Sequence, residues 1–238
     1  MAGTDSWTLL NNVDSGGYVD IMYSQRDQKL YAIRDCDLKL EAWDLRDPKK
    51  THTTVTTPVP NPDNAGEFGT SKKKYYLVES MGDILVVRRY VTHHVDNNGK
   101  VMPLPNWPYR TVNFEVMKLN SDRDNWEVVK DLDDRVLFVG LNQSVSVSTA
   151  ELNLRPNSIY FADDSFDLMH KSVFEKTYFT DREFWQYEDE GASGGHDFGV
   201  FDLKGKSVRW KPWRGHRRGN TGLCYPPPPV WAFVYPQV

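Results

Sequence analysis

The sequence predicts an all-β protein built like a β-propeller, from repeated antiparallel four-stranded blades. Three observations favour this fold class: short apolar runs alternate with turn residues, a six-residue pattern recurs three times, and aromatic residues make up 13% of the 238 residues. Aromatic side chains suit the half-buried, pleated surface of a sheet. No run has the 3.6-residue period of a long amphipathic helix, and the one short helix that we expect lies at residues 165–174.

The strand candidates are fourteen short apolar runs, each ending at turn residues. In the first half of the chain they are SWTLL from Ser6, YVDIMY from Tyr18, KLYAI from Lys29, LEAWDL from Leu40, YYLVES from Tyr75, ILVVRRY from Ile84 and NFEVMKL from Asn113. In the second half they are NWEVVKDL from Asn125, RVLFVG from Arg135, SVSVS from Ser144, SIYFADD from Ser158, DFGVFDL from Asp197, SVRWKPW from Ser207 and VWAFVYP from Val230.

The connections fall into two kinds. Tight turns are expected at 14–17, 81–83, 97–99 and 204–206, where glycine stands beside Ser, Asp, Asn, Met or Lys. Three longer segments rich in Pro, Gly or charge, at 51–74, 93–110 and 181–196, are expected to be surface loops. Loops of this kind usually carry the binding function of a propeller, so we expect contact with a partner at 93–110 and 181–196.

A six-residue template recurs as LEAWDL from Leu40, FEVMKL from Phe114 and FGVFDL from Phe198. Each copy follows a strand of the type LYAI, ILVV or IYFA. A repeated multi-strand unit with loops of different length favours a propeller over a sandwich. The copies lie farther apart than the roughly 40–50 residues of a compact blade. Either the template recurs in alternate blades or the loops are long.

The strand count predicts one propeller-type domain over residues 1–238 with an incomplete ring. Fourteen candidates supply about three and a half four-stranded blades, whereas closed propellers have roughly 4–8. An incomplete ring leaves sheet edges unpaired, and such edges promote self-association. The count therefore leaves three alternatives: the chain is part of a larger propeller, it self-associates, or it contains strands that these patterns miss.

Composition excludes several classes of protein. The net charge is −4, which argues against a global preference for nucleic acid or acidic lipid. No apolar run approaches the roughly 18 residues of a membrane span. Residues 1–17 contain no signal-like segment, so we expect the cytoplasm or the nucleus. Two cysteines, Cys36 and Cys224, allow one long-range disulfide but no zinc quartet.

The catalytic and metal-binding motifs are weak. Residues 191–195 read GASGG, but Ser193 stands between an acidic loop and a strand, where a hydrolase would need a strand-to-helix turn. His93 and His94 are adjacent, so on a strand they point to opposite faces. The acidic pairs at 133–134 and 163–164 stand at strand ends, where Asp usually accepts backbone hydrogen bonds. We therefore expect a protein without enzymatic activity, cofactor or bound metal.

The segment 204–218 suggests an alternative function. It contains seven Lys or Arg, no acidic residue, and two tryptophans, Trp210 and Trp213. Such a segment can bind phosphates and stack bases, here through Arg209, Lys211, Arg214, Arg217 and Arg218. It can equally be a solvated hairpin whose tryptophans pack inward, with the acidic loop nearby. The prolines at 226–229 are either a polyproline II ligand or a stiff lead-in to the final strand.

The order of these segments from about residue 6 to 231 resembles one plant family. The most specific block, 76–164, includes the phrases YLVES-MGDILVVRRY, TVNFEVMKL, NWEVVKDLDDRVLFVGLNQSVSVS and LRPNSIYFADD. These phrases resemble the KIB-type β-propeller domain that many plant F-box proteins contain, long labelled a domain of unknown function.

The resemblance implies a propeller that recruits substrate proteins, joined to an N-terminal F-box that docks a Skp adaptor in a cullin ubiquitin ligase. Family members carry the F-box and the first propeller strands ahead of the SWTLL segment. Here Met1 lies five residues before Ser6, and no leucine-rich F-box helices are present. We therefore expect a truncated gene product, a shortened paralogue or a fragment, and we still expect it to bind a protein partner. The absence of a visible F-box argues against the usual link to Skp adaptor and cullin. The resemblance supplies no catalytic residues and no fixed substrate-contact motif.

Overall fold

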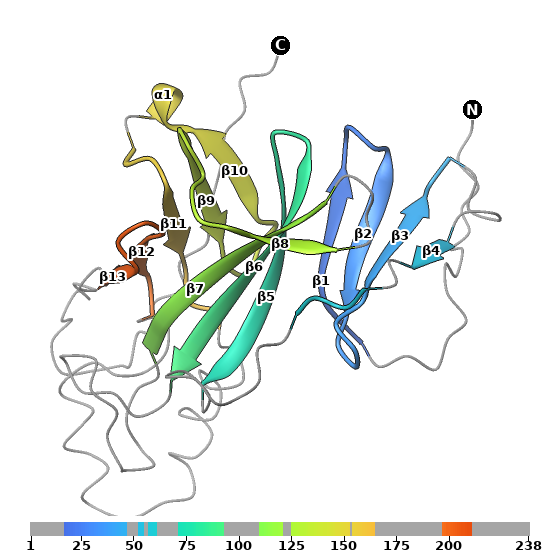
Figure 1. The fold of residues 1–238 in the computed structure, drawn as a ribbon, viewed down its shortest axis with the longest axis horizontal. Helices are drawn as coiled ribbons and strands as arrows, with labels where there is room; N and C mark the ends of the chain where they lie inside the picture. The colour runs from blue at the N-terminus through green and yellow to red at the C-terminus, as the bar shows by residue number, and fades with distance from the viewer. Residues whose placement is uncertain are drawn as a thin grey trace, which may run out of the picture.

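The structure is a computed structural model that describes residues 17–46, 52–54, 57–60, 71–92, 110–120, 125–152, 154–164 and 197–210. These residues form three sheets and a single helical turn, α1 (Thr149–Leu152) (Figure 1). The protein is therefore all-β, as the sequence predicts, and the three sheets do not close a ring.

The first two sheets are antiparallel four-stranded meanders. The first follows the order β1 (Tyr18–Ser24), β2 (Lys29–Arg34), β3 (Leu40–Asp44) and β4 (His52–Thr54). The second follows the order β5 (Lys72–Ser80), β6 (Asp83–Thr92), β7 (Arg110–Leu119) and β8 (Trp126–Val129).

The third sheet has five strands and departs from the expected blade. Its spatial order is β10 (Val145–Ser148), β9 (Arg135–Val139), β11 (Ser158–Phe161), β12 (Gly199–Asp202) and β13 (Ser207–Trp210). β9 and β11 run parallel, with Ser158 opposite Val136, while the other pairs are antiparallel. The chain passes through α1 between β10 and β11, and this crossover allows the parallel pairing.

Twelve of the strand candidates form strands; the candidates from Ser6 and Val230, and the helix expected at 165–174, lie outside the described residues. Three boundaries were wrong. β4 and the first three residues of β5 fall inside the loop expected at 51–74, and β7 begins at Arg110, the last residue of the loop expected at 93–110. Lys72 and Lys73 join β5 because the ladder to Val91 and Tyr90 uses backbone groups, whatever the polarity of the side chain. The helical turn α1 was not expected.

The repeated template occupies the same place in each sheet. Its three copies become β3, β7 and β12, each next to the last strand of its sheet. The preceding LYAI, ILVV and IYFA segments become β2, β6 and β11. The template therefore recurs in consecutive sheets, and long loops account for its wide spacing.

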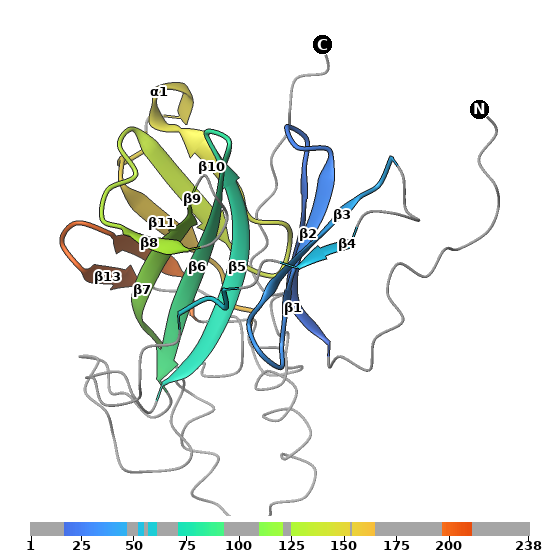
Figure 2. The ribbon, with the colours of Figure 1, turned by 45° about the vertical axis from the view of Figure 1, so that its right-hand side comes forward.

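The second sheet packs between the other two and is buried on both faces (Figure 2). Ile84 and Val86 of β6 face a cluster shared with the first sheet, while Leu85 and Val87 face a cluster shared with the third. Side chains alternate across a strand, so burial on both faces requires the continuous apolar run ILVV.

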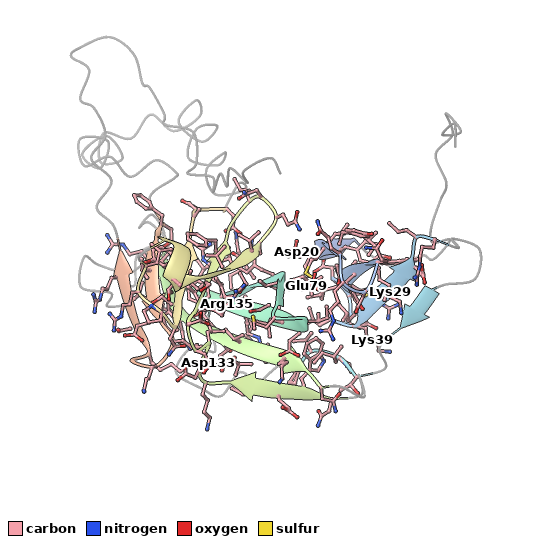
Figure 3. All side chains as sticks on the ribbon, turned by 90° about the horizontal axis from the view of Figure 1, so that it is seen from above. Asp20, Lys29, Lys39, Glu79, Asp133 and Arg135 are labelled. Atoms are coloured by element: carbon pink, nitrogen blue, oxygen red, sulfur yellow. The ribbon has the colours of Figure 1, made fainter. Side chains whose placement is uncertain are left out.

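Hydrogen bonds between side chains and neighbouring strands join the sheets at their innermost strands. The Asp20 carboxylate accepts the Leu77 N–H at 2.6 Å, and the Ser24 hydroxyl donates to Glu79 at 3.0 Å. Figure 3 shows Asp20 and Glu79 where the first two sheets meet. Burial raises the pKa of Asp20, against the backbone N–H groups of Leu77 and Ile21, which lower it. On the other side, the hydroxyls of Ser80 and Ser146 join β5 to β10 at 2.8 Å.

Candidate functional site

The residues that flank the two predicted contact loops lie at one end of the second and third sheets. β6 ends at Thr92 and β7 begins at Arg110, and these two residues are paired (Figure 1). In the third sheet, β11 ends at Phe161 opposite Gly199 of β12, and residues 165–196, which include the second predicted loop, lie between these two strands in the sequence. We call this edge, from which residues 93–109 and 165–196 depart, the loop-bearing end.

Arg89 is the centre of this end. It comes from the segment ILVVRRY, on the face of β6 that packs against the third sheet, and its side chain is fully buried. Its guanidinium donates to the Asp197 carboxylate at 2.9 Å, to the Ala162 carbonyl at 2.8 Å and to the Thr111 hydroxyl at 2.6 Å. The planar fork of arginine can satisfy several acceptors at fixed angles, which suits a buried junction of three strands.

Asp197 connects residues on both sides of 165–196 with the start of β7. Its carboxylate accepts the Thr111 N–H at 3.0 Å and the Thr111 hydroxyl at 2.7 Å. Its own N–H donates to the Asp163 carboxylate at 3.3 Å. Asp163 precedes the loop that Asp197 follows, and Thr111 follows the loop that begins after Thr92. The residues on either side of 165–196 are therefore hydrogen-bonded to each other, and Asp197 is also bonded to Thr111, near the start of β7. We call Arg89, Thr111, Asp163, Asp164 and Asp197 the root cluster.

Asp164 extends the root cluster to the innermost strand. It accepts a hydrogen bond from Lys74 at 2.6 Å and one from the Tyr76 hydroxyl at 2.7 Å, and Arg89 lies 3.2 Å away. Burial alone would raise the pKa of Asp164, but Arg89 and Lys74 hold that pKa below its ordinary value. A lowered carboxylate pKa stabilises the fold above the ordinary pKa of aspartate, and this stabilisation is lost as the pH falls through the lowered pKa. Burial lowers the pKa of Lys74, against the attraction of Asp164.

Arg88 is buried on the opposite face of β6. Its guanidinium donates to Glu115 at 2.8 Å, and the Tyr90 hydroxyl donates to the same carboxylate at 2.5 Å. Burial and this bond to Glu115 raise the pKa of Tyr90 to about 12. Neither arginine is among the site residues that we expect from the sequence. Two adjacent charges inside an apolar strand were the available signal, because each such charge must find buried partners.

The acidic pairs considered as catalytic candidates have different roles. Asp163 accepts a backbone N–H, as expected for Asp at a strand end, whereas Asp164 binds side chains instead. Asp133 adopts a left-handed turn conformation with φ of 54°, and Asp134 accepts the Ser148 hydroxyl. The pairs stand at opposite ends of the third sheet, so the structure does not bring them together.

The structure describes only some of the remaining residues that the sequence singled out. Ser193, His93 and His94 lie outside the described residues, as do the loops themselves. Within the described ranges, no group of three or more His, Cys, Asp or Glu could hold a metal ion, and no helix is long and apolar enough to cross a membrane. Cys36 is an exposed free thiol.

The basic segment 204–218 begins as the hairpin between β12 and β13. Lys206 lies with its ammonium 5.9 Å from the centre of the Phe201 ring. Asp202, at the root of the hairpin, accepts hydrogen bonds from the Gly205 N–H and from Arg155. Of the proposed phosphate-binding residues, Arg209 lies on β13 opposite Val200. The others, Lys211, Arg214, Arg217 and Arg218, lie outside the described residues, so this alternative stays a prediction.

Comparisons with known proteins identify the family. The family model of the KIB1-4 β-propeller matches residues 1–202. The F-box protein SKIP23 of Arabidopsis thaliana is 28% identical over 233 residues, which cover 95% of this chain and 48% of that protein. A putative F-box/kelch-repeat protein of the same plant is 35% identical over 78 residues, or 30% of this chain and 21% of that protein. No solved structure matches.

The chain thus spans about half the length of SKIP23 and less of the second relative. A β-propeller family and relatives named as F-box proteins fit a protein-interaction module, as the sequence predicts. The order and spacing of the segments, the three consecutive sheets and the match over residues 1–202 agree: the chain belongs to the KIB1-4 β-propeller family.

Proposed function

We propose that residues 1–238 form a single propeller-type module without enzymatic activity, and that it binds a protein partner through residues 93–110 and 181–196. The root cluster is the observation that carries this proposal. Arg89 and Asp197 hold the residues flanking both loops within hydrogen-bonding distance of one another. Two loops whose flanking residues are bonded to each other can contact the same partner together.

Loops whose ends are fixed by hydrogen bonds bind a partner at a lower cost in free energy. Association costs free energy for every loop that must be ordered in the complex, so fixed roots reduce the conformational freedom that is lost. Loops on a stable scaffold are also where binding residues concentrate in many folds. The scaffold here is a sheet with apolar contacts on both faces.

We further propose that the partner is a substrate-type protein and that the module acts in the cytoplasm or nucleus. The names of the relatives as F-box proteins support a role as a substrate-recruiting part of a ubiquitin ligase. A link to Skp adaptor and cullin by the usual route requires an F-box, and none is visible in these 238 residues.

Affinity purification from plant extract, followed by quantitative mass spectrometry, tests this function. The bait is the 238-residue chain, and a second bait carries glycine-serine segments of equal length in place of 93–109 and 181–196. We expect proteins that co-purify with the first bait to be lost from the second. In the control bait, residues 121–124, which join β7 to β8 at the opposite end, are exchanged instead.

Partners that remain on the loop-exchanged bait as strongly as on the control would place the contact surface elsewhere. Co-purification of Skp adaptor and cullin would show that a ligase link exists. Recovery of other proteins without them would indicate a free binding module, and recovery of chaperones alone would contradict the proposal.

A further inference from the structure

The end of the sheets opposite the root cluster presents a prominent apolar side chain. Met81 is 78% exposed, more than any other large hydrophobic residue of the described part of the chain. It stands at the tip of the two-residue turn that joins β5 to β6, after Ser80, which pairs with Asp83 (Figure 1).

The backbone at this tip does not favour methionine. Met81 has a φ of 54° and Gly82 a φ of 84°, the combination of a type I′ hairpin turn. Asn, Asp and Gly suit the first of these positions, whereas other side chains are strained there. The hairpin alone would fold better with Asn at 81, so its geometry gives no reason for methionine.

The tip also contacts the turn between β1 and β2. Arg26, from the turn between β1 and β2, donates to the Gly82 carbonyl at 2.7 Å. A Cβ atom at position 82 would stand 1.7 Å from the Arg26 guanidinium, so any other residue at 82 would require the Arg26 side chain to move. Ser24 and Glu79 bond at 3.0 Å just below. We call residues 24–29 and 80–83 the turn pair.

We propose that the turn pair is a second docking point, for a protein partner that takes Met81 into an apolar pocket and places a carboxylate against Arg26. Methionine and arginine are enriched at the centres of protein interfaces. Arg26 is exposed, and its hydrogen bond to the Gly82 carbonyl uses one of the five N–H donors of a guanidinium. Because Met81 and Arg89 stand at opposite ends of β6, this docking point is separate from the loops.

Site-specific photo-crosslinking in plant extract tests the proposal. The full chain carries a photoreactive methionine analogue at position 81, or at position 128 as the control, since Val128 is also well exposed at 66%. We expect a defined protein to crosslink at 81 and not at 128. In affinity purification without crosslinking, the amount of that protein that co-purifies should be about tenfold lower with the Met81→Asn chain than with the wild-type chain. A loss of this size is typical of a residue that anchors an interface.

The Met81→Asn chain separates binding from folding. Because asparagine tolerates the left-handed conformation, its thermal unfolding midpoint should equal or exceed that of the wild type while binding is lost. Equal recovery on wild-type and Met81→Asn chains, or no crosslink at 81 beyond that at 128, would overturn the proposal. A drop in the unfolding midpoint would also overturn it, because Met81 would then serve the fold.

Discussion

Replacing Arg89 with methionine is expected to lower the free energy of unfolding by about 3–5 kcal/mol. The substitution keeps much of the volume of the side chain but removes the cation that faces Asp197, and both side chains are fully buried. A buried carboxylate without a counter-ion costs far more than an exposed ion pair contributes. Domains of this size are stable by only about 5–15 kcal/mol, so this loss would remove a large fraction of the stability.

Equilibrium denaturation by urea measures this effect. Arg46→Met is the matched control: Arg46 pairs with Asp44 at an exposed turn, with 67% of its side chain accessible, and its loss should hardly move the midpoint. If Arg89→Met does not fold at all, Arg89→Lys keeps the charge and should give a measurable, smaller loss. Equal midpoints for Arg89→Met and Arg46→Met would contradict the role given to the root cluster.

The second large effect is expected for Phe114→Ala, at about 3–5 kcal/mol. Phe114 is fully buried on β7, and its ring lies 5.3 Å from the rings of both Phe161 and Phe201 in the third sheet. Removing it leaves a cavity at the contact between two sheets, and the flanking rings cannot fill that cavity without moving their strands.

Two further variants calibrate this prediction, measured by the same urea titration. Phe114→Leu restores most of the volume and should recover most of the stability. Val128→Ala, on the exposed edge strand β8, should change the free energy of unfolding by less than about 0.5 kcal/mol. If Phe114→Ala were as mild as Val128→Ala, the second and third sheets could not be packed through these rings.

Local sequence patterns were sufficient to predict most strands. A run such as YVDIMY or ILVVRRY ends at turn residues, and both features lie within about ten residues of each other. The template of β3, β7 and β12 likewise predicted repeated sheets, because each copy meets the same neighbours. β4 was missed since its three residues, His-Thr-Thr, show no apolar pattern.

The root cluster could not be predicted in the same way. It joins Arg89, Asp164 and Asp197, whose mutual positions depend on how the sheets pack. The parallel pairing of β9 with β11 depends equally on distant contacts, and it replaces the antiparallel blade that local patterns suggest. The sequence leads us to expect loops at 93–110 and 181–196, but it carries no sign that one cluster joins the residues that flank them.

The central claim is that hydrogen bonds of the root cluster hold together the residues that flank both predicted loops. Amide hydrogen exchange measured by NMR tests this claim most directly. The Thr111 N–H and the Asp197 N–H each donate to a buried aspartate, at 3.0 and 3.3 Å. The Arg46 N–H also donates to an aspartate, at 3.1 Å, but in an exposed turn, which makes it the control. We predict that the amides of Thr111 and Asp197 exchange only through global unfolding, as slowly as those in the centre of β6, while Arg46 exchanges through local motion. Exchange at Thr111 and Asp197 as fast as at Arg46 would contradict the account.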